Sequence, residues 1–336
     1  MKIYSKPTIH RIILFLLFIA IGNPTTFGQN KNFWVPSDTI NKSRLWLVAG
    51  GGGLAYTAAS VGLYEIWYKQ YPRSNFRFFD DWGEWENMDK WGHAMTAYTE
   101  SFLAYKGARW VGFEHKPSVW IGAGVGTLLQ TTVEVMDGFS ENWGFSIPDF
   151  AFNTGGVALF VSQELLWQEQ RILLKVSNTR PNYSTTPLTN PSTGFTATPR
   201  EAAFDLFGTN YAEAFLKDYN GMTIWATLSP YSFLSQRQKE RTWVPPWLGV
   251  SVGIGADGIY GAYGNVWTAP SGDRLPLLEI ERYKQYYLSL DIDTGRIRTR
   301  SPFLKTVFSV IRWIKVPAPT LEWNTKGQLI FHPIYW

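Results

Sequence analysis

The hydrophobic period of this chain changes partway along its length, and this change constrains the fold more than any other feature. Four apolar segments of helical length occupy the first half: residues 44–68, 90–112, 118–136 and 148–175. They are rich in Gly, Ala and Thr, so packing rather than intrinsic helicity must stabilise them. Gly122, Gly124 and Gly126 suit a close contact between two helices.

Beyond Gly221 apolar residues alternate with small or polar ones, which is the period of a strand with one apolar face. Strands are expected at 248–256 and 286–292, a hairpin at 320–332, and amphipathic helices at 199–220 and from Pro302. The sequence therefore predicts an α+β fold. A bundle of about four antiparallel helices is followed by a small antiparallel β region with amphipathic helices.

Residues 1–29 have the pattern of an export signal. Lys2, Lys6 and Arg11 form a basic start, and the apolar run that follows, 12–21, is too short to cross a bilayer of about 30 Å. The predicted organisation is therefore a signal peptide at 1–29, helices at 30–176, a linker at 177–200 and a mixed region at 201–336. The linker is assigned because 177–200 is full of Ser, Thr, Asn and Pro.

Charge and composition narrow the class of partner. The formal charge is +4, of which three belong to the signal, so the mature chain is near +1 and has no electrostatic reason to bind nucleic acid. Aromatic residues make up 17% and charged residues also 17%, a balance that favours a membrane surface or an envelope glycan or protein as partner. The chain has no Cys, which excludes disulfides, thiolate metal sites and an acylated cysteine.

Two uncharged segments, 45–64 and 117–133, approach the length that spans a membrane. Their content of Gly, Ala and Thr and the mean hydropathy of −0.15 favour a peripheral protein instead. A polytopic membrane protein stays as an alternative.

The sharpest local pattern begins the second predicted helix, where His93 follows Asp89 by four residues and Glu100 lies two turns further on. The short link at 113–117 makes the second and third helices antiparallel neighbours. The start of the second helix, the end of the third and the start of the fourth then meet. His93, Glu134 and Asp149 are therefore expected to converge at one end of the bundle.

Two interpretations of this convergence are open. In the structural one, Asp89 and Ser146 cap helices, and a buried Lys90 pairs with Glu134 or Asp149. In the functional one, His93 with Glu134 or Asp149 forms a catalytic acid–base pair, and a bound ligand contacts four further residues: Asp89, Lys90, Glu100 and Asn153.

A metal site is a third possibility for the same cluster. His93, Glu134 and Asp149 would suit zinc or iron, but one histidine is a sparse ligand set, and no metal is expected. No cofactor is identified from the sequence. His115 and His332 have no evident partner.

The same motif carries a family resemblance. Asp89-Lys90-x-x-His93, Glu134, Ser146-x-x-Asp149, Asn153 and Gly155-Gly156 resemble the uncharacterised YfiM-like envelope family and, more distantly, VanZ-like proteins. The resemblance implies an exported, membrane-associated protein of unknown activity. Members are typically described as periplasmic lipoproteins, whereas this chain has no cysteine to acylate, so any anchoring must be non-covalent.

The sequence thus predicts a periplasmic protein associated with the outer membrane. Its first predicted function is a non-catalytic component that binds a membrane, a glycan or a protein. The alternative is an enzyme acting on an envelope lipid or glycan.

Overall fold

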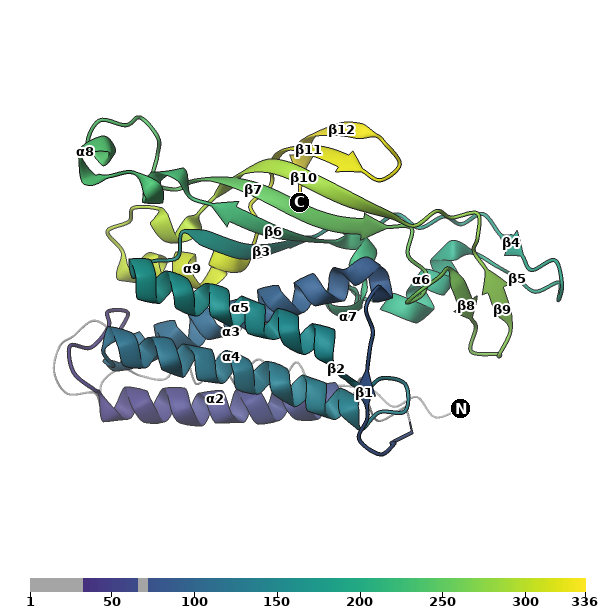
Figure 1. The fold of residues 1–336 in the computed structure, drawn as a ribbon, viewed down its shortest axis with the longest axis horizontal. Coiled ribbons are helices and arrows are strands. Elements are labelled where there is room, and N and C mark those ends of the chain that lie inside the picture. Colours follow the sequence, from purple (N-terminus) through teal and green to yellow (C-terminus); the bar gives the residue numbers. More distant parts are fainter. Residues whose placement is uncertain (1–32, 66–71) are drawn as a thin grey trace.

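The computed structural model describes residues 33–65 and 72–336, so the predicted signal at 1–29 lies outside the described part. The predicted α+β class is confirmed, with long helices in the N-terminal half and antiparallel strands later (Figure 1). The four long helices are α2 (Lys42–Leu63), α3 (Met88–Val111), α4 (His115–Gly138) and α5 (Ile147–Trp167). None of the helices in these described ranges is long and apolar enough to cross a bilayer.

Six strands form the main sheet, in the spatial order β12-β11-β10-β7-β6-β3 with every neighbouring pair antiparallel. Their bounds are β3 (Ile172–Asn178), β6 (Met222–Leu228), β7 (Leu248–Asp257), β10 (Tyr283–Ile292), β11 (Ala318–Asn324) and β12 (Leu329–Tyr335). Short pairs are β1 (Phe78–Phe79) with β2 (Phe145–Ser146), β4 (Leu188–Thr189) with β5 (Thr196–Ala197), and β8 (Val266–Thr268) with β9 (Arg274–Pro276). Shorter helices are α6 (Pro199–Phe207), α7 (Tyr211–Lys217), α8 (Gln236–Lys239) and α9 (Pro302–Val310).

Three expectations about these elements are corrected by the structure. The fourth helix, expected to reach residue 175, ends at Trp167, because Gln168 adopts a left-handed conformation and the chain then enters β3. The helix expected over 199–220 is two helices, since Gly208 ends α6 with a positive φ and Asn210 caps α7. The β region is also larger than expected, because β3 and β6 extend it to six strands.

The helices pack closely at glycines. A Cβ at Gly122 or Gly126 of α4 would collide with Ser101 of α3, and one at Gly156 of α5 would overlap the carbonyl oxygen of Ala94. Gly124, expected to serve the same contact, faces open space. The glycines therefore bring the backbones of α4 and α5 against α3, whose inner side chains share one core with Leu174, Val176 and Ile224 of the sheet.

The sheet is strongly curved. Three strands separate β12 from β6, yet the Tyr335 hydroxyl lies 3.0 Å from the Thr223 hydroxyl. Tyr335 also donates to the Tyr287 hydroxyl, and the indole of Trp336 donates to the Lys315 carbonyl at 2.8 Å. The C-terminal strand thus folds back over one face of the sheet and buries it.

The buried face is the polar one. Lys175, Ser251, Ser289 and Asp291 are almost fully buried there, and the Lys175 ammonium lies 2.8 Å from Asp291. Trp225 shares this face, where its indole donates a hydrogen bond to Ser177, but most apolar side chains of the strands occupy the alternating positions and point the other way. On β3, β6 and the end of β7 they pack in the core with the helices, and on β10, β11 and β12 most of them are exposed. The period-two segments therefore carry their apolar side chains outward over most of the sheet.

The two adjacent glycines of α5 give a matched test of the helix contact. We expect Gly156→Ala to lower the free energy of unfolding by about 1–3 kcal/mol, because its methyl group collides with α3. Gly155→Ala has nothing within contact distance and should raise it by about 0.5–1 kcal/mol through helix propensity. Urea unfolding followed by circular dichroism measures both, and equal effects of the two changes would contradict the packing.

Candidate functional site

The structure brings His93, Glu134 and Asp149 together at one end of the helices. His93 Nδ1 lies 3.5 Å from Glu134 Oε1, and His93 Nε2 lies 3.8 Å from Asp149 Oδ2. The three side chains come from the first turns of α3, the last turns of α4 and the first turn of α5. This is the arrangement that the antiparallel α3–α4 pair predicts.

The local chain geometry sets the start of α3. Three residues before it, Trp85, Glu86 and Asn87, have positive φ, and Asn87 rather than Asp89 stands at the N-cap position. The expected cap at Asp89 is therefore wrong, and this side chain is instead buried in the first turn of α3. At α5 the expectation is confirmed, since the Ser146 hydroxyl accepts a hydrogen bond from the Asp149 amide at 2.9 Å.

Lys90 is fully buried and holds three aspartates. Its ammonium lies 2.7 Å from Asp81, 2.8 Å from Asp89 and 2.9 Å from Asp149. Burial disfavours the charged lysine, but the surrounding carboxylates outweigh burial and raise the pKa of Lys90. The predicted pairing with Asp149 is found, and the one with Glu134 is not.

Asp81 is the member of this cluster that sequence reasoning did not single out. It lies in the loop before α3, is 5% exposed, and accepts a hydrogen bond from the Ser146 hydroxyl at 2.6 Å. Its sequence neighbourhood holds several acidic residues, and no periodic pattern distinguishes the one that turns inward.

Glu134 has a different environment. It is fully buried, and its oxygens accept hydrogen bonds from the Asn153 amide at 3.2 Å and the Ser146 backbone N–H at 3.4 Å. Burial raises the pKa of Glu134 to about 8 and that of Asp149 to about 6. Burial also opposes charging of His93, but Asp149 and Glu134 outweigh it and raise the pKa of His93.

Asn153 and His93 define the side of the cluster nearest to solvent. Asn153 Oδ1 lies 3.2 Å from His93 Nδ1, and 22% of the His93 side chain is exposed. Two cavities in the described part of the chain lie away from this cluster. One is beside Tyr98 and Phe102, and the other is along 234–242. The cluster is therefore a tightly packed polar group with one partly open side.

Glu100, predicted to bind the same ligand, lies outside the cluster. Its carboxylate accepts a hydrogen bond from Gln130 of α4 at 2.8 Å, and burial raises the pKa of Glu100 to about 7. Two further histidines in the described part of the chain also have partners that the sequence does not reveal. His115 lies 3.0 Å from the buried Glu164, and His332 lies 2.8 Å from the buried Glu322.

The cluster around Lys90 yields a stability prediction. Lys90→Met should lower the free energy of unfolding by about 3–5 kcal/mol, because it leaves three buried aspartates without their cation. Lys116→Met, at an exposed position near the start of α4, serves as the control and should change it by less than about 0.5 kcal/mol. Chemical denaturation measures both, and wild-type stability of the Lys90 variant would refute the structural importance of the pairing.

Glu100 yields a pH prediction. With a pKa of about 7 when folded, against an ordinary value of 4.5, its carboxyl binds a proton in the folded state that the unfolded chain has released. The stabilisation of the folded state by this proton is complete below about pH 4.5 and is lost as the pH rises through 7. Glu100→Gln should therefore unfold like the wild type near pH 4.5 and be more stable by about 1–2 kcal/mol near pH 8.

Thermal or urea unfolding across this pH range measures the difference. Glu114→Gln, at the exposed start of α4, is the matched control. A constant difference between Glu100→Gln and wild type at all pH values would contradict the assignment.

Comparison with known families supports part of the sequence interpretation. Residues 78–163 match the family described as "Predicted periplasmic lipoprotein (DUF2279)", and this segment holds the whole cluster from Asp81 to Asn153. No curated protein and no solved structure matches the chain. The match does not extend to VanZ-like proteins, and none of the 336 residues is a Cys that could carry the lipid of the family description. Together with the predicted export signal, the match supports an exported protein of the cell envelope.

Proposed function

We propose that this protein is a non-catalytic envelope component that attaches to a lipid bilayer without a covalent anchor, through the apolar outer face of its curved sheet. The observation that carries the proposal is the inverted sheet. Its buried face holds lysine, aspartate and hydroxyl side chains, and its exposed face holds aliphatic and aromatic ones. The outer membrane is the bilayer we expect it to meet.

We define the outer sheet face by nine exposed apolar residues on the outward side of strands β7, β10, β11 and β12. They are Val250, Val252, Tyr286, Leu288, Leu290, Leu321, Trp323, Leu329 and Phe331. The register places Val252, Leu288, Leu321 and Phe331 in one row across the four strands. This row is 42–60% exposed, so the face is continuous rather than a scatter of single side chains.

The size of this face decides whether it can replace a lipid anchor. Burying a large apolar side chain completely contributes about 2 kcal/mol, so nine roughly half-exposed ones contribute about 9 kcal/mol in total. A fourteen-carbon acyl chain contributes on the order of 10 kcal/mol, at about 0.8 kcal/mol per methylene. The outer sheet face is thus comparable with one acyl chain, which by itself supports reversible membrane binding.

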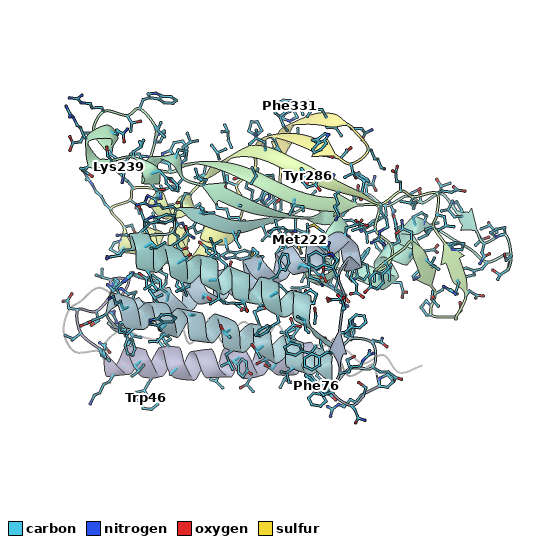
Figure 2. The ribbon with its side chains drawn as sticks, viewed as in Figure 1. Trp46, Phe76, Met222, Lys239, Tyr286 and Phe331 are labelled. Carbon is cyan, nitrogen blue, oxygen red and sulfur yellow. The ribbon has the colours of Figure 1, made fainter. Side chains whose placement is uncertain are left out.

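The chemistry of the face favours lipid over glycan. Sugar binding needs polar side chains that donate and accept hydrogen bonds beside the aromatic rings, and no member of the outer sheet face is charged or an amide. The outward sides of the helices have the same character, with Trp46, Trp120, Leu128 and Leu166 at least 57% exposed. Figure 2 shows that Phe331 of β12 and Trp46 of α2 mark opposite sides of the molecule.

Vesicle flotation tests the proposal. Mature protein is mixed with vesicles of phosphatidylethanolamine and phosphatidylglycerol, and we expect most of it to float with the lipid at both low and high salt, because the contact is uncharged. The double change Val252→Glu and Leu288→Glu, on adjacent strands at facing positions, should reduce the bound fraction at least about tenfold.

Leu278→Glu is the matched control, since Leu278 is 76% exposed but lies outside the outer sheet face. It should float like the wild type, and circular dichroism should show all variants folded. Failure of the wild type to float, or equal flotation of the double variant, would overturn the proposal. Release by salt alone would indicate an electrostatic contact instead.

The enzymatic alternative stays a prediction. It rests on His93 as the partly exposed member of a group whose two carboxyls have raised pKa values. The tight packing around these residues gives a substrate little room, which is why the attachment function is preferred.

A further inference from the structure

We infer that His93, Glu134 and Asp149 form a binding site for one divalent transition-metal ion. One nitrogen of His93 and one oxygen from each carboxylate all lie within 4.8 Å of one another. The site is separate from the outer sheet face and does not depend on membrane attachment.

The spacing of the donor atoms suits a shared ion better than hydrogen bonds. The 3.8 Å between His93 Nε2 and Asp149 Oδ2 is too long for a hydrogen bond. Two zinc–ligand bonds of about 2.1 Å span up to about 4.2 Å, so a single ion can bridge these atoms. Glu134 offers the third ligand, because one of its carboxylate oxygens belongs to the set of donor atoms that lie within 4.8 Å of one another.

The charge balance supplies a second, independent reason. Four carboxylates in this region, those of Asp81, Asp89, Glu134 and Asp149, are at most 7% exposed, and Lys90 is the cation buried among them. Lys90 bonds to the three aspartates but not to Glu134. Glu134, fully buried, has only two long hydrogen bonds from neutral groups and the nearby imidazole. A buried carboxylate in such a place needs a proton or a bound cation.

Asn153 can fix the tautomer of His93 that binds a metal ion. When its Oδ1 accepts a hydrogen bond from His93 Nδ1–H, Nε2 is left unprotonated and faces Asp149. This is the usual arrangement of a metal-binding histidine, whose second nitrogen donates to a fixed acceptor. The exposed side of His93 leaves space for water or another ligand to complete the coordination.

The donor set identifies the class of ion. One imidazole with two carboxylates suits zinc, manganese or ferrous iron, whereas calcium and magnesium prefer oxygen alone. The neighbouring group of Asp81, Glu84 and Asp89 also has atoms within 4.8 Å of one another, but the Lys90 ammonium already neutralises Asp81 and Asp89. We therefore assign the ion to the histidine site.

Metal analysis of the mature, tag-free protein tests this inference. The protein is stripped with a chelator, re-equilibrated with zinc, manganese or ferrous iron, and freed of excess metal. We expect about one ion per chain by mass spectrometry of the metal, together with a rise in melting temperature for the ion that binds. Glu134→Gln and His93→Gln keep the side-chain size and should weaken the affinity at least about 100-fold.

His115→Gln is the matched control, because His115 is also partly exposed and also paired with a buried glutamate, but at the other end of α4. It should keep the full metal content. Absence of a stoichiometric ion in the wild type, or equal metal content in wild type and the folded Glu134→Gln protein, would overturn the inference. Since flotation is measured separately, failure of membrane attachment would leave this result unaffected.

Discussion

The buried ion cluster of Lys90 ties the helical part of the molecule together. Its ammonium joins the loop before α3, the first turn of α3 and the first turn of α5 through Asp81, Asp89 and Asp149. A fully buried ammonium is stable only with such partners, so these three segments must keep their relative positions. The same positions bring His93 and Asn153 beside Glu134, so the arrangement of the candidate site depends on this cluster.

The family match falls on this part of the chain and on little else. Residues 78–163 hold the cluster, α3, α4 and most of α5, whereas the curved sheet lies beyond the matched segment. The matched segment therefore contains the polar group at the meeting point of three helices. We propose that the outer sheet face attaches to a membrane and that the polar group binds a metal ion.

The candidate site was largely predictable because it depends on short-range connectivity. The link at 113–117 is too short for anything but an antiparallel return, so the convergence of His93, Glu134 and Asp149 follows from helix positions alone. The role of Asp81 and the separate position of Glu100 were not predictable. They depend on which loop side chain turns inward and on which neighbour, here Gln130, a helix face meets.

The sequence by itself determined the four long helices, the strands beyond residue 248 and the alternation of apolar and polar residues along those strands, and it predicts an export signal. Only the tertiary structure decided which side of the sheet is buried, because alternation defines two faces without assigning either to the interior. That choice depends on the curvature through which Tyr335 and Trp336 return over the polar face, and on the pairing of Lys175 with Asp291 beneath them. Two of these contacts, Thr223 with Tyr335 and Lys175 with Asp291, join residues more than a hundred positions apart, and no local pattern in the sequence encodes such pairings.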